Sequence, residues 1–314
     1  MGMYLFSLAG FALLFGGGEF LVRGAVTVSR RLGLSPLLIG MTVVAWCTSA
    51  PELVVSLGAA LEGRSDIAIG NVVGSNIFNI LGVLGAAAII TPIVVDQRAL
   101  RRDVVVMLAS AAALSIVAMS GVIARGPAAV LLVALVLYVG ISYRSEARRP
   151  TLPSAALHEH ESAEVGASGT VRSGVIYLVA GLIALVIGSR LLIAGASEIA
   201  RTFGVAEAVI GLSLVAVGTS LPELATSIIA ALRRHPDVAV GNVVGSNIFN
   251  VLGILGITAL VRPVGIAEQI ASTDVWIMVG VSLLAAALLW RGRIGRLAAG
   301  VFLLGYAVYL VVLF

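Results

Sequence analysis

The ten-residue sequence GNVVGSNIFN occurs twice in this chain, at Gly70–Asn79 and again at Gly241–Asn250. Both copies belong to a longer internal repeat. A constant shift in numbering aligns Gly18–Pro92 with Ser189–Pro263 without a gap, and nearly half of the aligned positions are identical. Self-similarity of this kind is typical of a repeated structural unit. The sequence therefore predicts two similar halves, residues 1–145 and 173–314, joined by a linker at residues 146–172.

The composition places this chain in a membrane. Of its 314 residues, 60% are hydrophobic and only 11% are charged, and the mean hydropathy is +1.10. A soluble domain carries about 25% charged residues, so a large soluble enzyme is a poor interpretation. Apolar stretches of about 20 residues, each long enough to cross a bilayer as a helix, recur along the whole chain. We therefore predict an all-α membrane protein.

Ten apolar spans can be identified, and they end at Gly, Pro, Arg or Asp, as helices commonly do. They are Met3–Val28, Leu34–Ala60, Ile67–Ile90, Val104–Gly121, Pro127–Tyr143, Gly174–Ala200, Ala206–Leu232, Val238–Leu260, Val275–Trp290 and Leu297–Phe314. The polar stretch Ser145–Arg172 separates the fifth span from the sixth. Its His158 and His160 could bind a metal, but a solvated linker is the simpler interpretation.

The arginines indicate the orientation of these spans. Each half holds five spans, an odd number, so the second half must enter the membrane from the opposite side. All twenty basic residues are Arg, and with the N-terminus outside, fourteen lie in inner loops and four in outer loops. This bias follows the positive-inside rule. We expect a multi-pass protein of the cell inner (plasma) membrane as two inverted five-helix repeats, with both termini outside and the linker cytoplasmic.

Two matching segments place a carboxylate inside an apolar span. They are AWCTSAPE at Ala45–Glu52 in the second span and AVGTSLPE at Ala216–Glu223 in the seventh. Even on the scale of cellular insertion, an acidic residue at the centre of a membrane helix costs about 2.5–3.5 kcal/mol. A bound cation would compensate this cost, so Glu52 and Glu223 are the leading candidates for ion ligands.

Proline gives these segments further oxygen ligands. Pro51 and Pro222 have no N–H group, so the carbonyl groups of Cys47 and Gly218 should lose their usual helical partner. Broken helix backbone at membrane depth is tolerated only where protein or a cavity surrounds it, and such broken helices are common in transporters. Carbonyl, hydroxyl and carboxylate oxygens suit Ca²⁺, Na⁺ or Mg²⁺ and do not suit Zn²⁺ or Cu²⁺.

The third and eighth spans add a polar face. Asn71, Ser75 and Asn79 are four residues apart and therefore share one side of a helix. The second repeat places Asn242, Ser246 and Asn250 in the same way. The alternative role for such side chains is hydrogen bonding between helices. It is left open above all for four asparagines, which are Asn71, Asn76, Asn242 and Asn247.

Four other charges lie within or beside the spans. Glu19 and Arg23 are four residues apart on one helix and can form an ion pair. Arg190 occupies the repeat position of Glu19, so an ion pair between the two halves is an alternative. Glu198 is expected near a membrane edge. We interpret all four as structural or gating groups.

These motifs resemble the cation/Ca²⁺ exchanger superfamily, in particular prokaryotic Na⁺/Ca²⁺ antiporters. Thr-Ser-X-Pro-Glu followed by Gly-Asn-X-X-Gly-Ser-Asn-X-X-Asn occurs here twice, and the resemblance extends over nearly the whole chain. It implies ten helices with interlocked repeats around central ion sites, which the first and sixth helices would slide across. It also implies ion ligands from the glutamates, from the carbonyls of Thr48, Thr219, Ala45 and Ala216, and from the side chains of Ser49, Ser220, Ser75, Ser246, Asn79 and Asn250.

One position of this chain departs from the pattern of the family that it resembles. The Na⁺/Ca²⁺ branch has Asp where this chain has Asn250, so the predicted site holds two carboxylates instead of three. Two carboxylates balance one Ca²⁺, two Na⁺ or two H⁺. Three Na⁺ would leave a positive charge uncompensated in a medium of low dielectric constant, which is unfavourable. A stoichiometry of three Na⁺ is therefore in doubt, and coupling to H⁺ stays open.

The function that we expect from the sequence is Ca²⁺ extrusion in exchange for Na⁺ by alternating access. The alternatives are an H⁺/Ca²⁺ antiporter on the same scaffold and, from another class, a passive cation channel. An intramembrane hydrolase is not supported, because the sequence has no paired Asp, His-Glu-X-X-His or Gly-X-Ser-X-Gly motif. We therefore expect a transporter and not an enzyme, with no cofactor and no nucleic-acid partner. The transported ions would be Ca²⁺ and Na⁺, or H⁺ in place of Na⁺. Membrane lipid would surround the protein, no protein partner can be inferred, and a monomer would suffice.

Overall fold

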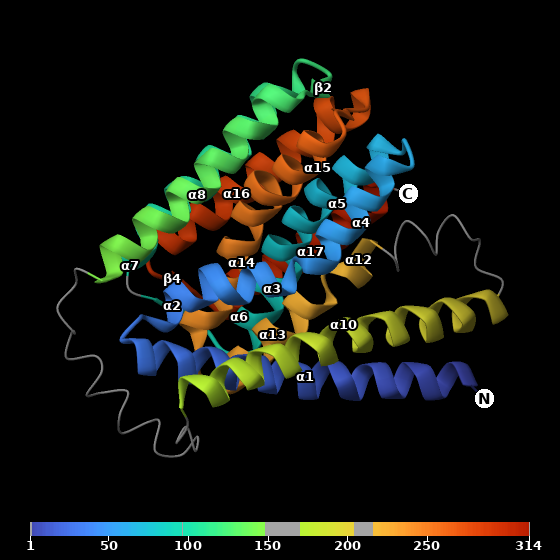
Figure 1. Cartoon of the computed structure of the whole chain (residues 1–314). Coiled ribbons are helices and arrows are strands. Elements are labelled where there is room, and N and C mark those ends of the chain that lie inside the picture. The colour runs from blue at the N-terminus through green and yellow to red at the C-terminus, as the bar shows by residue number, and fades with distance from the viewer. Residues whose placement is uncertain (1, 96, 148–169, 204–215, 314) are drawn as a thin grey trace.

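The structure is a computed structural model that describes residues 2–95, 97–147, 170–203 and 216–313 (Figure 1). Most of the predicted linker, with His158 and His160, lies outside these residues, as does the first part of the predicted seventh span. The first half contains helices α1 (Gly2–Leu32), α2 (Pro36–Ile39), α3 (Ala45–Thr48), α4 (Ala50–Leu61), α5 (Ser65–Phe78), α6 (Gly85–Ile90), α7 (Gln97–Ala118) and α8 (Arg125–Ala147). The second half contains α10 (Val171–Thr202), α12 (Ala216–Thr219), α13 (Leu221–Leu232), α14 (Pro236–Phe249), α15 (Gly256–Val261), α16 (Val275–Trp290) and α17 (Arg296–Leu313).

Within the described ranges, four segments have the wider π-helical turn, in which the backbone N–H bonds five residues back instead of four. They are η1 (Gly40–Val44), η2 (Asn79–Leu84), η4 (Asn250–Leu255) and η5 (Ile270–Asp274). η2 joins α5 to α6, and η4 joins α14 to α15 at the matching place in the second half. These turns were not predicted from the sequence.

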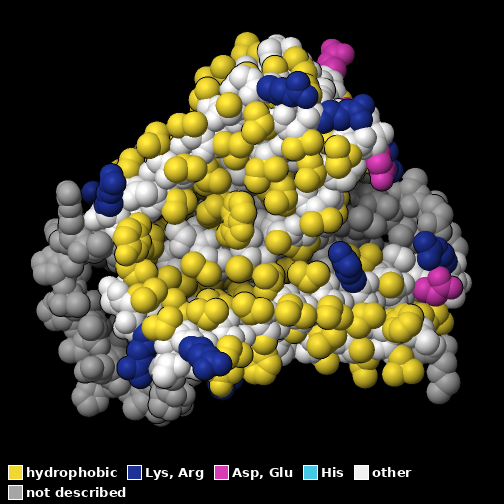
Figure 2. Space-filling view, in the orientation of Figure 1, with side chains coloured by type: hydrophobic (Ala, Val, Ile, Leu, Met, Phe, Trp, Pro, Cys, Tyr) yellow, Lys and Arg dark blue, Asp and Glu magenta, His cyan; other side chains and the backbone are white. Residues whose placement is uncertain are grey.

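The helices are apolar enough for a membrane. Among the described residues, six helices have the length and composition of a membrane span, and the bent pair Pro36–Thr48 and Ala50–Leu61 would be a seventh. On the face shown in Figure 2, hydrophobic side chains cover most of the surface and charged side chains gather mainly towards its edges. The protein is therefore an all-α membrane protein. Helical residues occur in each of the ten predicted spans, and the number of membrane crossings stays a prediction.

In the part of the chain that the structure describes, two short strand pairs connect the halves. β1 (Ile93–Val94) pairs with β4 (Arg293–Ile294), and β2 (Val122–Ile123) pairs with β3 (Val264–Gly265), both antiparallel. The shift in numbering that aligns the internal repeat converts β1 into β3 and β2 into β4. Each pair therefore joins a strand of one half to a strand of the other, and the two pairs correspond to each other.

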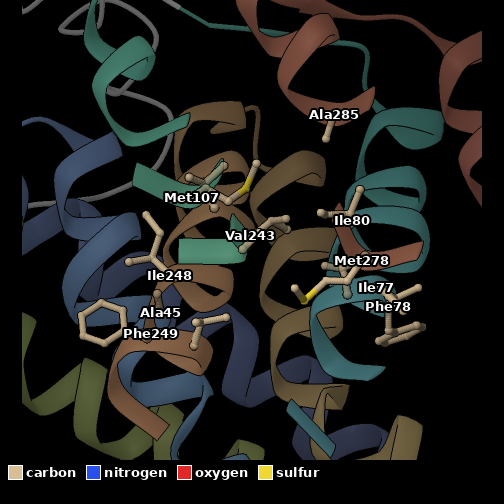
Figure 3. Packing of buried hydrophobic residues seen from close by; sticks show 14 of the residues in the cluster. Ala45, Ile77, Phe78, Ile80, Met107, Val243, Ile248, Phe249, Met278 and Ala285 are labelled. Atoms are coloured by element: carbon tan, nitrogen blue, oxygen red, sulfur yellow. The ribbon is translucent and has the colours of Figure 1, made fainter. Parts of the chain in front are cut away.

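The core is built around the helices that contain the repeated ten-residue sequence. In the apolar windows of Ser65–Ile90 and Pro236–Val261, 78% and 89% of the residues are buried. Figure 3 shows apolar side chains from several elements meeting here, among them Ala45, Met107, Val243 and Met278. Burial of apolar area from both halves in one cluster holds the halves together.

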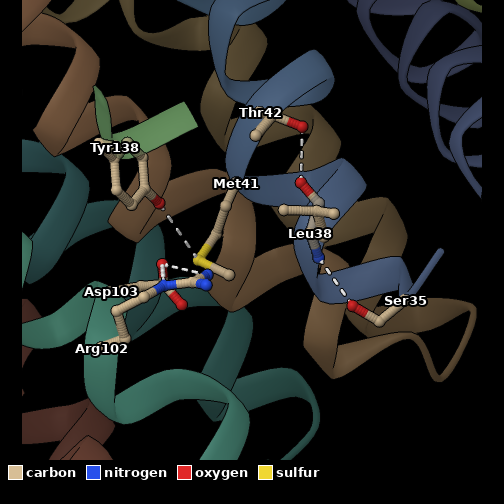
Figure 4. Close-up of polar contacts among 7 residues, drawn as sticks. All are labelled: Ser35, Leu38, Met41, Thr42, Arg102, Asp103 and Tyr138. Atoms are coloured by element: carbon tan, nitrogen blue, oxygen red, sulfur yellow. Dashed lines mark hydrogen bonds and ion pairs between the residues drawn. The ribbon is translucent and has the colours of Figure 1, made fainter. Parts of the chain in front are cut away.

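The segment that leads to the first Thr-Ser-X-Pro-Glu motif is fixed by local hydrogen bonds (Figure 4). Ser35 caps α2, because its Oγ accepts a hydrogen bond from the N–H of Leu38 at 3.2 Å. Thr42 Oγ1 donates to the carbonyl of Leu38 at 2.7 Å. Tyr138 of α8 points its hydroxyl at the sulfur of Met41, 3.8 Å away. These contacts hold α2 and η1 in place ahead of the motif.

α1 and α10 are the two long helices that lie side by side along one edge of the molecule (Figure 1). Glycines recur at a regular heptad interval on both, at Gly10, Gly17 and Gly24 and at Gly174, Gly181, Gly188 and Gly195. Low-numbered glycines of α1 meet high-numbered residues of α10, so the helices are antiparallel. A Cβ atom on Gly181 would lie 2.6 Å from the Leu21 nitrogen and 2.7 Å from the Gly17 oxygen. The two backbones are therefore in direct contact, as small residues allow in membrane helices.

We predict that Gly181→Ala lowers the thermal stability of the purified protein, because the added methyl group must push α1 and α10 apart. Overpacking of this kind costs about 1–3 kcal/mol, which should lower the midpoint of thermal unfolding in detergent by several degrees. The matched control is Gly16→Ala, whose Cβ atom would have no described atom within 4 Å. Both changes favour the helix to a similar extent. An unfolding midpoint that is equal in the two variants would contradict direct backbone contact.

Candidate cation-binding site

The two Thr-Ser-X-Pro-Glu motifs form helix breaks. α3 ends at Thr48, and α4 begins at Ala50 with an axis bent by 43°. Ser49 at the break has φ −82° and ψ 5°, and Ser220, its equivalent, has φ −91° and ψ 10°. Proline is well suited to the first turn of a helix because its missing N–H would have no helical partner there. Each motif therefore starts a new helix at the depth where its glutamate lies.

The glutamates lie in the first turns of α4 and α13 and are completely buried. The N-terminus of a helix favours a negative charge, so this placement lowers part of the cost of burial. Glu52 Oε1 accepts a hydrogen bond from Ser220 Oγ at 2.8 Å, and Glu223 Oε1 accepts one from Ser49 Oγ at 3.0 Å. Each carboxylate is thus bound by the serine of the opposite motif, which brings the two motifs into one site.

Asn71 connects the Glu52 motif to the other half of the chain. Its Nδ2 donates to Ser56 Oγ at 3.0 Å and to the backbone carbonyl of Glu52 at 3.3 Å. Its Oδ1 accepts a hydrogen bond from Thr219 Oγ1 at 3.3 Å. The Thr219 hydroxyl is therefore fixed by a residue of the opposite half.

The second half repeats this arrangement. Asn242 Nδ2 donates to Ser227 Oγ at 3.0 Å and to the backbone carbonyl of Glu223 at 3.2 Å. Asn242 Oδ1 accepts from Thr48 Oγ1 at 3.0 Å. The contacts of Asn71 and Asn242 support the interhelical role left open for these residues. Ser56 and Ser227 were not predicted, although each lies four residues after its glutamate and each recurs at the repeat interval.

Asn79 and Asn250 are the first residues of the π-helical segments η2 and η4, and both are completely buried. Asn79 Nδ2 donates to Asn247 Oδ1 at 3.2 Å, and Asn250 Nδ2 donates to Asn76 Oδ1 at 2.9 Å. η2 packs against α13 and η4 packs against α4, the helices that contain the two glutamates. The amide group of each asparagine is therefore held from one side.

The remaining predicted ligands are placed as follows. Ser75 Oγ meets Ser220 Oγ at 3.1 Å, and Ser246 is completely buried. The carbonyl of Ala45 accepts from the Ser49 N–H at 3.0 Å, so it is turned along its own helix. Ala216 is the first residue of α12, and its side chain lies outside what the structure describes.

The carbonyl of Gly218 does lack its helical partner next to Pro222, as the sequence predicts. It accepts a hydrogen bond from Ser189 Oγ of α10 at 2.6 Å. This oxygen is thus satisfied by the protein. The sequence alone could not identify Ser189 as the partner, because α10 is distant from Gly218 along the chain.

Several buried oxygen atoms at the centre of this network have no partner. Ten buried side-chain N or O atoms lack a hydrogen bond within the described part of the chain, and half belong to predicted ligands. These five are Glu52 Oε2, Glu223 Oε2, Asn79 Oδ1, Asn250 Oδ1 and Ser246 Oγ. Leaving such an oxygen unsatisfied costs about 1–3 kcal/mol, and more when it is charged.

This donor set fits a hard cation. It consists of carboxylate, amide and hydroxyl oxygens, which are the ligands that Ca²⁺ and Na⁺ prefer. No group of three or more His, Cys, Asp or Glu side chains is found in the described ranges, so the negative charge comes from the two glutamates. A cation between them would satisfy the free oxygens and offset the two buried charges.

The charges at the periphery are only partly as predicted. Glu19 and Arg23 form the expected ion pair at 3.5 Å. The alternative pair of Glu19 with Arg190 is not formed, and Arg233 takes its place at 2.7 Å. The reason is that α1 packs along α13, which ends next to Arg233. Glu198 pairs with Arg201 at 3.2 Å on the exposed surface.

Asp103 is another buried acid, and it is paired with an arginine (Figure 4). It is completely buried, and its Oδ1 accepts two hydrogen bonds from the neighbouring Arg102 at 2.9 and 3.0 Å. Tyr138 lies beside it. At the repeat interval, Tyr309 donates to Asp274 Oδ1 at 3.3 Å. Arg102 neutralises the charge of Asp103, so this acid does not need a cation.

Comparison with known proteins identifies the family of this chain. The family model described as sodium/calcium exchanger protein matches residues 3–144 and 173–314. The chain is 36% identical to the inner membrane protein YrbG of Escherichia coli, over 98% of this chain and 95% of that one. It is 32% identical to the sodium/calcium exchanger MaX1 of Methanosarcina acetivorans, over 99% and 98%. The solved structure of the sodium-calcium exchanger NCX_Mj soaked with Na⁺ and Sr²⁺ superposes with a TM-score of 0.86 at 30% identity, covering 99% of this chain and 98% of that one.

We predict that Ca²⁺ raises the thermal unfolding midpoint of the detergent-solubilised protein, and that Glu52→Gln and Glu223→Gln each abolish most of this increase. A ligand at one hundred times its Kd stabilises the folded state by about 2.7 kcal/mol, and the neutral amide removes half of the negative charge of the site. Glu198→Gln is the matched control, because this glutamate is exposed and pairs outside the site. An unchanged Ca²⁺ response in both site variants would contradict the assignment.

Proposed function

We propose, because this chain belongs to the sodium/calcium exchanger family, that it is a secondary antiporter which extrudes Ca²⁺ in exchange for Na⁺. The observation on which this proposal depends is the pair of buried glutamates, each with one oxygen bound by the opposite motif and one oxygen free. Transport of this kind forms and breaks no covalent bond. The protein would be a transporter that acts on ions as cargo.

Competition for one set of oxygens would couple the two ions. The same free oxygens can bind Ca²⁺ or Na⁺, so occupancy by one excludes the other. Since the described site has two carboxylates, one Ca²⁺ or two Na⁺ leaves it neutral. A third Na⁺ would add a net positive charge to a buried site, which is costly. We therefore propose an electroneutral exchange of two Na⁺ for one Ca²⁺.

The movement that we propose is alternating access by ten helices in two inverted repeats. The backbones of α1 and α10 are in direct contact at their glycines. This contact supports a joint movement of the two helices across the rest of the protein. Each ion would change the equilibrium between the two facings only through a difference in its affinity for them. In the orientation that the arginines favour, both termini are outside and the linker is cytoplasmic.

A second candidate is H⁺/Ca²⁺ exchange by the same scaffold. The observation that favours it is the complete burial of Glu52 and Glu223, since burial disfavours a charged carboxylate that lacks a cation. Two protons would replace one Ca²⁺ without a change in the charge of the site. The two candidates therefore share the residues and differ in the counter-ion.

We predict that proteoliposomes loaded with Na⁺ take up ⁴⁵Ca²⁺ from a Na⁺-free medium, and that Glu52→Gln and Glu223→Gln reduce the initial rate at least a hundredfold. The amide cannot supply the charge that balances Ca²⁺. Uptake should be unaffected by a membrane potential imposed with K⁺ and valinomycin, because the proposed exchange moves no net charge. The rate of uptake in wild-type and Glu268→Gln vesicles should be the same, because Glu268 is exposed and lies outside both motifs.

Each alternative has its own result in this experiment. Uptake driven by a pH gradient without Na⁺ would establish the H⁺ antiporter. Uptake that needs no counter-ion and that a membrane potential accelerates would establish a channel. Full activity in both glutamine variants would refute the site.

A further inference from the structure

We propose that Asn76 and Asn247, which are not among the predicted ion ligands, are positioning residues that turn the amide oxygens of Asn79 and Asn250 towards the ion. This inference rests on the proposed function, since it deepens the description of the same site. All four side chains are buried, with at most 2% exposure. They come from the two copies of the ten-residue sequence and meet at the contact between the halves.

The orientation of these amides follows from which groups can donate a hydrogen bond. Asn76 Nδ2 lies 3.4 Å from the backbone carbonyl of Asn247, and Asn247 Nδ2 lies 3.3 Å from the backbone carbonyl of Asn76. A carbonyl oxygen only accepts, so each of these amides must present its NH₂ group to the other backbone. The Oδ1 atoms of Asn76 and Asn247 therefore face the opposite way.

Asn76 and Asn247 in turn fix the orientation of the amide groups of Asn79 and Asn250. Asn250 meets the Oδ1 of Asn76 at 2.9 Å, and Asn79 meets the Oδ1 of Asn247 at 3.2 Å. Each must offer its NH₂ group there, because two acceptors would repel each other. The Oδ1 atoms of Asn79 and Asn250 are then left on the side away from this contact. Both are buried and unpaired within the described chain, and Asn76 and Asn247 thereby give the site two correctly oriented neutral oxygens.

The same arrangement favours an amide at position 250. A carboxylate there would place an acceptor oxygen against Asn76 Oδ1, and Asn76 could turn its NH₂ group round only by losing its bond to the Asn247 carbonyl. A buried acceptor without a donor is unfavourable. Asn76 therefore disfavours a third carboxylate at position 250, and the number of carboxylates in the site depends on Asn76 as well as on Asn250.

The test is a double-mutant cycle read by equilibrium binding of ⁴⁵Ca²⁺ to the purified full-length protein. Asn76→Leu removes the group that orients Asn250, and we expect the Kd for Ca²⁺ to rise about tenfold. Asn250→Asp changes the Kd by some factor in each background. We expect this factor to be about tenfold smaller in the Asn76→Leu background than in the wild type, because the new carboxylate then no longer faces an acceptor. Thr258→Val, a completely buried hydroxyl with no described partner, is the control and should leave the Kd unchanged.

The outcomes separate positioning from simple packing. If Asn76→Leu lowers the thermal stability of the ion-free protein and leaves the Kd unchanged, the residue is structural and the proposal is wrong. The proposal would also be wrong if the double variant changed the Kd by the product of the factors measured for Asn76→Leu and Asn250→Asp alone. If the wild type binds Ca²⁺ but does not transport it, the proposed function fails while this inference can still be decided.

A second inference concerns a pair of charges between α1 and α13, and it is independent of the asparagine contacts. Arg233, which follows α13, binds Glu19 of α1 through two hydrogen-bond contacts of 2.7 and 2.8 Å. Next to it, Gly18 lies against α13, where its Cβ atom would be 3.1 Å from Ile229 and 3.3 Å from the Ala225 carbonyl. This ion pair therefore fastens α1 to the end of α13.

The internal repeat contains the same pair with its charges exchanged. The alignment of the two halves places Arg190 on α10 at the position of Glu19, and Glu62 after α4 at the position of Arg233. In the described structure Arg190 and Glu62 are not paired, and Glu62 binds its neighbour Arg64 instead. One half of the protein thus has the contact and the other half has only the residues for it.

α4 is less closely packed than α13 at the equivalent positions. Val54, the equivalent of Ala225, is 62% exposed, and a Cβ atom on Gly58, the equivalent of Ile229, would have no described atom within 4 Å. A cavity of about 40 Å³ lies beside α4 and is lined by Trp46, Ser49, Ala50 and Leu53. Ser49 lines this cavity and binds Glu223, so the cavity borders the candidate site.

We infer that the two ion pairs form alternately. The Glu19–Arg233 pair closes the α13 side in the present structure, and the Arg190–Glu62 pair closes the α4 side after α1 and α10 have moved. This inference also rests on the proposed function, because it describes how the two facings would be held. In the orientation that the arginines favour, the present structure is closed towards the cytoplasm and open towards the outside.

The test uses cysteine pairs in a Cys47→Ala background with a short, reducible thiol crosslinker. We expect the pair Glu19→Cys with Arg233→Cys and the pair Arg190→Cys with Glu62→Cys to crosslink under opposite Na⁺ gradients in proteoliposomes. Each crosslink should stop ⁴⁵Ca²⁺ uptake, and reduction should restore it. The pair Glu198→Cys with Arg201→Cys lies within α10, so it is the control that should crosslink under every condition.

Two results would overturn this inference. One is that the cysteines at positions 190 and 62 never crosslink. The other is that both pairs crosslink equally under every gradient. The charge-exchanged variant Glu19→Arg with Arg233→Glu tests the role of charge, and it should recover most of the uptake that either single change removes. A wild type without Na⁺-driven uptake would refute the proposed function, while the crosslinking pattern would still show whether the two pairs alternate.

Discussion

The structure depends on one constraint, which is that two carboxylates must be kept inside an apolar protein interior. A buried charge is tolerated only when hydrogen bonds and an opposite charge replace the water that it has lost. Here each glutamate lies at the start of a helix, accepts a hydrogen bond from a serine of the other half, and keeps one oxygen free. The helix breaks, the crossing of the two motifs and the surrounding asparagines all serve this requirement.

The burial of these charges also explains why neither half could fold into this site alone. Glu52 needs Ser220, Glu223 needs Ser49, and the threonine of each motif donates to an asparagine of the other half. Hydrogen bonds in a buried network strengthen one another, and a missing member leaves its partners unsatisfied. The two halves are therefore joined most tightly where the chemistry of the protein would take place.

Much of the fold and the site was predictable, because membrane helices have a strong composition signal and the motif is duplicated. The length of the repeat, the charge of Glu52 and Glu223 and the polar face of Asn71, Ser75 and Asn79 all follow from the sequence. The π-helical turns at Asn79 and Asn250 were not predicted, since one extra residue in a turn changes neither composition nor periodicity. The partners of Asn76 and Gly218, and Arg233 as the second partner of Glu19, were missed. They depend on which helix faces which, and this is set by close packing over the whole protein.

The mutual exchange of hydrogen bonds between the halves has a consequence for the direction of transport. If the two halves are inverted, as we propose, then an ion at the centre meets the same kinds of oxygen whether it arrives from one side of the membrane or the other. Such a binding site cannot itself act as a rectifier. The direction of net flow would then be decided by the ion gradients of the cell and by the arginines that orient the chain in its membrane, and the same molecule would run backwards when those gradients are reversed.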